Sequence, residues 1–135
     1  VVEAISQCNG IAALCQAMKD LPINEELQST AIGALRNIVF GNDAYKTYAV
    51  RAGAIPATVT AMMRFQHDAK LQEQSIAALT SVCDTVGRAA LCARLGGIEA
   101  IISAMKRHPS TGHVAELGCI ILCMFCDDGQ MRHYI

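Results

Sequence analysis

The stretch Arg51-Ala52-Gly53-Ala54-Ile55 returns 43 positions later as Arg94-Leu95-Gly96-Gly97-Ile98. A weaker copy, Cys8-Asn9-Gly10-Ile11, lies 44 positions before the first of these stretches. A period of about 40–47 residues with helical patterning is typical of a solenoid, in which each unit packs on its neighbours. The repeat therefore predicts an all-α solenoid, and it favours binding over catalysis.

Apolar residues after each copy are spaced three, four and seven apart, which is the pattern of one helix face. A second periodic segment follows over residues 27–38, 71–82 and 114–125. Shorter segments at 44–52 and 87–95 end at the glycines. Each unit is thus expected to be a short helix, a glycine turn and two longer helices. The sequence has no period-two alternation bounded by turns, so no sheet is expected.

This three-helix unit resembles the armadillo repeat, and the resemblance covers essentially the whole chain. It is carried by Gly53-Ala54-Ile55-Pro56, by Gly96-Gly97-Ile98 and by Ala34-Leu35-Arg36-Asn37-Ile38. The resemblance implies a right-handed α-solenoid of three-helix armadillo-type repeats. The two-helix HEAT repeat is the runner-up, and it lacks the extra short helix expected at 44–52 and 87–95.

The register divides the single segment 1–135 into repeats at about 1–41, 42–84 and 85–127, with the start of a fourth at 128–135. In the first repeat, the short helix is expected over residues 1–8. Asp127 and Asp128 are expected to cap the helix that begins the fourth repeat. Because the chain ends inside a repeat and neither end shows polar capping, we expect it to be a piece of a longer array. Three repeats is near the minimum for a stable solenoid.

The composition excludes several classes of function. The chain is 53% hydrophobic with a net charge of −1 and no basic stripe, so no nucleic acid partner is expected. No apolar run approaches the length of a membrane span. Seven cysteines without a regular framework indicate a reducing compartment, which we take to be the cytoplasm, with the nucleus as the alternative.

The cysteines offer two kinds of chemistry, metal binding and nucleophilic catalysis. Cys119, Cys123 and Cys126 share one helical face, but we interpret them as packing residues rather than a zinc site. Cys119 occupies the register position of core isoleucines. Cys92 and Cys126 are expected to be the most exposed, and neither has a histidine at a helical spacing. We therefore predict no enzyme activity, catalytic residue, metal or cofactor.

In armadillo proteins the third helices line a concave groove, in which an extended peptide commonly lies. By this resemblance, one stripe of each third helix faces the groove and binds a partner. The groove candidates are Thr30, Gly33, Arg36 and Asn37 in the first repeat, Gln74, Ala77 and Ser81 in the second, and Leu117, Ile120 and Met124 in the third. The core-facing set is Ala34, Leu35 and Ile38, then Ala78, Leu79 and Val82, then Ile121, Leu122 and Phe125.

Asn37 stands where peptide-binding armadillo proteins carry an asparagine ladder, whose amides pair with a peptide backbone. Ser81 and Met124 replace the next two rungs, and the chain has no tryptophan to trap a basic side chain. The resemblance therefore does not extend to binding of nuclear-import signals. The expected partner is a protein or an extended peptide.

Leu117, Ile120 and Met124 form an apolar patch. The favoured interpretation is that a following segment covers them, and the alternative is an apolar docking site. The function indicated is a protein-interaction scaffold. The alternative is a structural spacer, or a segment that self-associates end to end through uncapped repeat ends.

Overall fold

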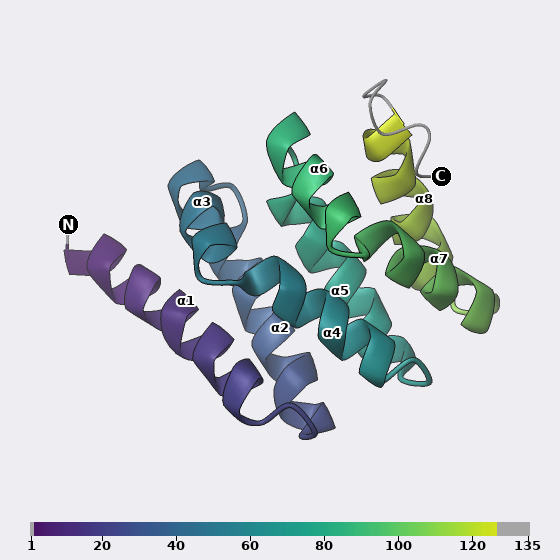
Figure 1. Ribbon diagram of the computed structural model, residues 1–135, viewed down its shortest axis with the longest axis horizontal. Helices are drawn as coiled ribbons and strands as arrows, with labels where there is room; N and C mark the ends of the chain where they lie inside the picture. The colour runs from purple at the N-terminus through teal and green to yellow at the C-terminus, as the bar shows by residue number, and fades with distance from the viewer. Residues whose placement is uncertain (1, 127–135) are drawn as a thin grey trace.

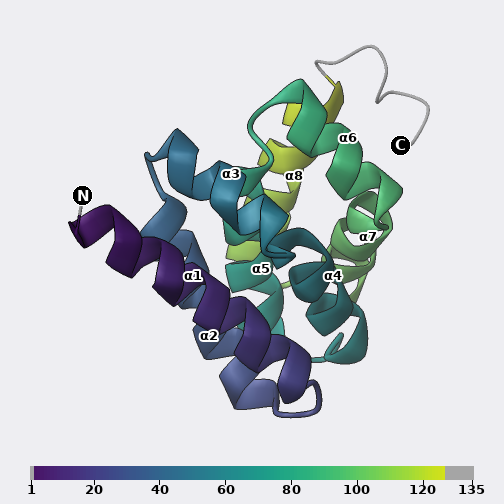
Figure 2. The same ribbon diagram turned by 60° about the vertical axis from the view of Figure 1, so that its left-hand side comes forward.

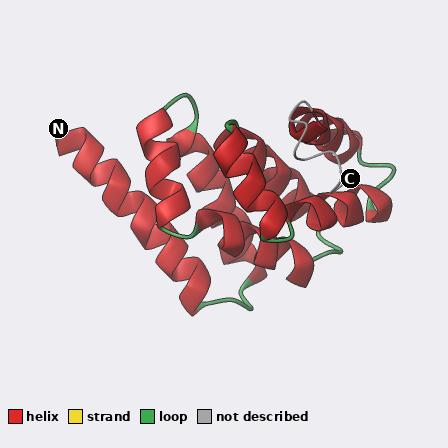
Figure 3. Cartoon of the chain, turned by 45° about the horizontal axis from the view of Figure 1, so that its top comes forward, coloured by secondary structure: helices red, strands yellow, loops and turns green. Residues whose placement is uncertain are grey.

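The computed structural model describes the backbone of residues 2–126 and the side chains of residues 7–126. This part of the chain folds into eight helices and contains no strand (Figure 3), which confirms the expected all-α class. The helices are α1 (Val2–Asp20), α2 (Glu25–Val39), α3 (Asp43–Arg51), α4 (Ala54–Arg64), α5 (Ala69–Val82), α6 (Val86–Arg94), α7 (Gly97–Arg107) and α8 (Gly112–Cys126). None of these helices is long and apolar enough to cross a membrane.

The helices form three sets, whose members lie side by side (Figures 1 and 2). Helices α2, α5 and α8 pack on one another in that order, and α5 lies between the other two. Helices α1, α4 and α7 form a second row in contact with the first. The short helices α3 and α6 lead into α4 and α7, at the residues where the sequence predicts short helices.

Side-chain caps and glycines set the helix boundaries. Asn24, Asn42, Asp68 and Thr85 each accept a hydrogen bond from a backbone N–H in the first turn of α2, α3, α5 and α6. The turns before α4 and α7 instead use Gly53 (φ 92°) and Gly96 (φ 89°). This left-handed backbone strongly favours glycine, so the two turns explain the recurring phrase.

The core runs between the two rows of helices. Of the expected core-facing residues, six are buried: Leu35, Ala78, Leu79, Val82, Ile121 and Phe125. Ala34, Ile38 and Leu122 are only partly buried, because the buried stripe runs through Ala31, Ile32 and Val39 on α2 and through Val114, Gly118 and Phe125 on α8.

A charged cluster joins α3 to α6. The guanidinium of Arg88 contacts Asp43 Oδ1 at 3.0 Å, Asp84 Oδ1 at 2.9 Å and Thr47 Oγ1 at 2.6 Å. Lys46 Nζ lies 2.7 Å from Asp84 Oδ2. Both cationic side chains are only 12% exposed, so water screens these pairs less than ordinary surface pairs.

The first unit differs from the prediction. A short helix over 1–8 and a turn at Gly10 were expected, but α1 runs unbroken from Val2 to Asp20. Gly10 is not among the glycines with positive φ. The physical reason is the residue at the turn position. When the copies are aligned on Ile11, Ile55 and Ile98, Asn9 stands where the other two units have Gly53 and Gly96, and the left-handed backbone of those turns favours glycine. The expected cap at Asp127 and Asp128 and the fourth repeat at 128–135 lie outside the described residues.

Candidate functional site

A hollow of about 400 Å³ opens over the ends of α2 and α5, next to α8. We call its lining the α2/α5/α8 face. The lining residues are Arg36, Asn37, Phe40, Ala77, Thr80, Ser81 and Leu117. The structure therefore brings residues from three helices that are far apart in sequence to one depression.

Five of the groove candidates line this hollow: Arg36, Asn37, Ala77, Ser81 and Leu117. They share it because their positions recur on helices packed side by side in register. The remaining candidates are Thr30, Gly33, Gln74, Ile120 and Met124, and they lie on the same three helices outside the hollow. The side chain of Gln74 lies over Gly33, so that pair fills the surface between α2 and α5.

Phe40 and Thr80 also line the hollow, and sequence reasoning missed both. Phe40 is 78% exposed at the end of α2 and follows Arg36 and Asn37 at spacings of four and three residues. That spacing places all three on one helix face, and it is the signal that could have found Phe40. Thr80 is the register match of Arg36, 44 residues earlier, and carrying that match to the second repeat would have found it. Its hydroxyl donates to the main-chain oxygen of Ile76 at 2.7 Å.

The polar groups of the α2/α5/α8 face suit a peptide ligand. Asn37 is exposed, and within the described residues its amide makes no hydrogen bond. Such an amide can accept from a peptide N–H and donate to a peptide carbonyl. Arg36 has no ion pair in the described structure and adds a cation beside it. Phe40 adds an aromatic surface on which an apolar side chain can pack.

The burial of two cysteines, Cys119 and Cys92, differs from the prediction. Cys119 was expected in the core but is exposed, because no described helix covers the side of α8 that neighbouring helices cover on α2 and α5. Cys92 was expected to be exposed but is fully buried, against Gly97 at the start of α7. Cys126 is partly buried and Cys123 is exposed.

Cys92 also affects a second thiol. Its hydrogen bond to Cys83, together with burial, raises the pKa of the Cys83 thiol far above its ordinary range. A thiol held in this neutral form is a poor nucleophile and a poor metal ligand. Among the described residues, no three His, Cys, Asp or Glu side chains are grouped closely enough to hold a metal ion.

One segment of the chain is similar to a known repeat. Residues 1–40 match the family model described as Armadillo/beta-catenin-like repeat. This segment is therefore similar to one armadillo repeat, and the all-helical structure of the described residues is consistent with further armadillo repeats. Armadillo repeats generally form protein-interaction scaffolds without catalytic activity. No curated protein and no solved structure matches the chain.

Proposed function

We propose that this protein is a non-enzymatic scaffold that binds an extended peptide segment of a protein partner on the α2/α5/α8 face. In this proposal the chain is a right-handed solenoid, with repeats at about 1–41, 42–84 and 85–127, and the α2/α5/α8 face is its concave groove. The observation that carries the proposal is the exposed, unpaired amide of Asn37 at the edge of a hollow with Arg36 and Phe40.

The residues of this face favour hydrogen bonds to a peptide backbone together with one apolar contact. Asn37 supplies the single amide, Ser81 supplies a hydroxyl at the next rung, and Leu117 begins an apolar surface on α8. A peptide held in this way gains sequence-independent hydrogen bonds at one end and an apolar contact at the other. Thr30, Gly33, Gln74, Ala77, Ile120 and Met124 extend the proposed surface along the three helices.

The test is selection of a displayed random-peptide library on the intact chain, followed by affinity measurements on variants. Asn37→Ala and Phe40→Ser should each weaken binding of the selected peptides about tenfold, because the first removes the amide that bonds to the peptide backbone and the second removes the aromatic surface of Phe40. Arg36→Ala should weaken acidic peptides most. Asn9→Ala and Arg94→Ala are matched controls, since both residues are exposed on other helices. Equal binding of the selected peptides to the intact chain and to all five variants would refute groove binding.

A second candidate function, self-association, rests on the outer side of α8. Ile120 is 46% exposed there, and Cys119 and Cys123 are exposed beside it. An exposed apolar strip of this kind can stack on another copy. Sedimentation velocity over a wide concentration range tests this function. Association that Ile120→Lys abolishes would support the spacer or self-assembly role, and a monomer at every concentration would exclude it.

A further inference from the structure

Gln66, in the connection after α4, makes side-chain hydrogen bonds to α7. Gln66 Oε1 accepts a hydrogen bond from Arg107 Nε at 2.8 Å and lies 3.4 Å from Ser103 Oγ. The main-chain oxygen of the same glutamine lies 2.7 Å from His108 Nε2. We call these contacts the Gln66 bridge. Through it, Arg107 and Ser103 of α7 share an acceptor that belongs to the connection between α4 and α5.

The preceding unit, at the corresponding positions of α1 and α4, has no such bridge. Arg64 and Thr60 on α4 correspond to Arg107 and Ser103 on α7, each 43 residues apart, and Pro22 stands where the next unit has Gln66. A proline side chain offers no acceptor. Arg64 and Thr60 are both exposed, and neither side chain has a partner in the described structure. Comparison of the two units therefore shows that Arg64 and Thr60 lack an acceptor equivalent to the side-chain oxygen of Gln66.

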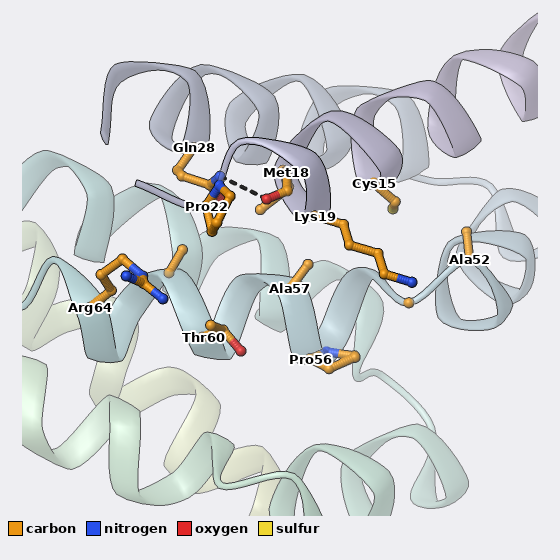
Figure 4. Close-up of a pocket in the computed structure, with 12 residues that line it drawn as sticks. Cys15, Met18, Lys19, Pro22, Gln28, Ala52, Pro56, Ala57, Thr60 and Arg64 are labelled. Atoms are coloured by element: carbon orange, nitrogen blue, oxygen red, sulfur yellow. Dashed lines mark hydrogen bonds between the residues drawn. The ribbon is translucent and has the colours of Figure 1, made fainter. Parts of the chain in front are cut away.

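A hollow of about 410 Å³ lies between α1 and α4 at this place, and Figure 4 shows Lys19 and Arg64 at its two ends with Thr60 between them. Its floor includes the buried Met18 and the small Ala57. Such a floor accepts an apolar side chain, while the two ends carry positive charge.

A second hollow of about 340 Å³ adjoins the first, because Cys15, Lys19 and Ala52 line both. It adds a third cation, Arg51. We call the two hollows together the α1/α4 trough. Neither contains an aspartate or glutamate, and Lys19, Arg51 and Arg64 have no ion pair within the described residues. Asp20, which accepts from Gln16 at 2.8 Å, does not line the trough.

We propose that the α1/α4 trough binds an acidic peptide segment of a protein partner. A carboxylate of the peptide pairs with Arg64 and accepts from the Thr60 hydroxyl, as Gln66 does for Arg107 and Ser103. Arginine and carboxylate form a charge-assisted pair that is stronger than the neutral amide contact it imitates. A neighbouring apolar side chain lies on Met18 and Ala57, and a further acid reaches Lys19 or Arg51. This site shares no residue with the α2/α5/α8 face, and it does not depend on the function proposed for that face.

The experiment selects a displayed random-peptide library on the intact chain, with counter-selection on the Arg64→Gln variant. This step removes peptides that bind the α2/α5/α8 face. The recovered peptides should carry aspartate or glutamate beside an apolar residue. Measured by fluorescence anisotropy, their affinity should fall about tenfold or more in Arg64→Gln and when the acid is replaced by its amide.

Three variants control this measurement. Arg94→Gln removes the same charge from an exposed site outside the trough and should leave affinity unchanged. Arg107→Gln, at the bridged equivalent, should also leave it unchanged. Pro22→Gln restores the missing acceptor, so it should weaken peptide binding and raise the melting temperature. Circular dichroism establishes that each variant folds.

Three results would overturn the proposal. The first is a selection that yields no peptides, or peptides without acids. The second is an equal loss of affinity in Arg64→Gln and Arg94→Gln, which would mean only a general charge attraction. The third is a dimer, detected by sedimentation, that Arg64→Gln dissociates, since the occupant would then be a second copy of this chain.

Discussion

Gln28 and Gln72 each hold the end of the preceding helix. The side-chain amide of Gln72 donates to the main-chain oxygens of Met62 and Phe65, both at 3.0 Å, and Gln28 repeats the arrangement one unit earlier. Both glutamines are almost completely buried. Truncation of Gln72 would leave the main-chain oxygen of Met62 without this donor, whereas that of Phe65 still accepts from the Asp68 N–H at 3.1 Å. A buried carbonyl without a donor is costly because water cannot replace the lost bond.

Gln72→Ala should therefore lower the free energy of unfolding by about 1–3 kcal/mol, measured by urea denaturation. Gln16→Ala is the control, because Gln16 is exposed and bonds only to Asp20 one turn away. It should change stability by less than about 0.5 kcal/mol. Equal effects of the two substitutions would show that the buried amide is not responsible.

The cluster around Asp84 should make stability depend on acid pH. Partial burial alone would raise the pKa of Asp84, but hydrogen bonds from Lys46 and Arg88 and their charges hold it below its ordinary value. A carboxylate whose pKa is lower in the folded state stabilises the fold above its unfolded pKa of about 4. That contribution is lost as the pH falls through the lower, folded value.

Asp84→Asn should therefore reduce the slope of unfolding free energy against pH below about pH 4. Lys46→Met should reduce the slope as well, because it removes the first of the partners that stabilise the charged form. Asp68, whose pKa is also lowered, keeps part of the slope in both variants. Chemical denaturation at a series of pH values measures this slope. An unchanged slope in Asp84→Asn would contradict the role assigned to Asp84.

At the scale of the helices, Gly10 and Gly53 should respond oppositely to alanine. A Cβ on Gly10 meets nothing within 4 Å, and alanine favours a helix interior, so Gly10→Ala should stabilise the protein by about 0.5–1 kcal/mol. Gly53 has φ 92°, a backbone conformation that costs alanine about 1–2 kcal/mol. Thermal denaturation distinguishes the two signs. A destabilised Gly10→Ala variant would indicate the broken helix that the sequence suggested.

Helix positions could be predicted from the sequence because helical periodicity and capping residues are local signals. The turns at Gly53 and Gly96 followed from the same repeat. The unbroken α1 could not be read from the copy at Gly10, because the alignment on Ile11, Ile55 and Ile98 puts Asn9, not Gly10, at the position of the turn glycines. The exposure of Cys119 and the burial of Cys92 depend on which neighbouring helix covers them, and no residue in their own segments encodes that.

The candidate site was predictable only in part, for a related reason. Five groove candidates line the hollow because register along packed helices carries a stripe from one unit to the next. Phe40 falls just beyond the periodic segment of residues 27–38, so a search confined to that segment passes over it, although the face of α2 extended by one residue includes it. The α1/α4 trough arises from one position, Pro22, whose effect becomes visible only beside the Gln66 bridge.

At the scale of the whole molecule, the two proposed surfaces use different rows of helices. The α2/α5/α8 face lies on one row, and the α1/α4 trough lies between α1, α4 and the short α3, with Gln28 as its one lining residue from α2. Because no residue is shared, substitutions in one should leave affinity at the other unchanged, as expected for independent sites. A scaffold with this layout could hold two peptide segments at once, and binding to both would be stronger than to either alone.

Stability should also be distributed unevenly along the array. Helix α5 packs against α2, α3, α4, α7 and α8, whereas α8 packs mainly on α5 and α7. In a repeat protein each unit is stabilised by its neighbours, so the element with neighbours on both sides opens last. Native-state hydrogen exchange should therefore find the slowest amides in α5, around the fully buried Ile76, and faster exchange in α8 around Ile121. Ile121→Ala should speed exchange in α8 far more than in α2, because the loss stays near its interface. Equal protection along all eight helices would instead mean that the described part of the chain unfolds as one cooperative unit.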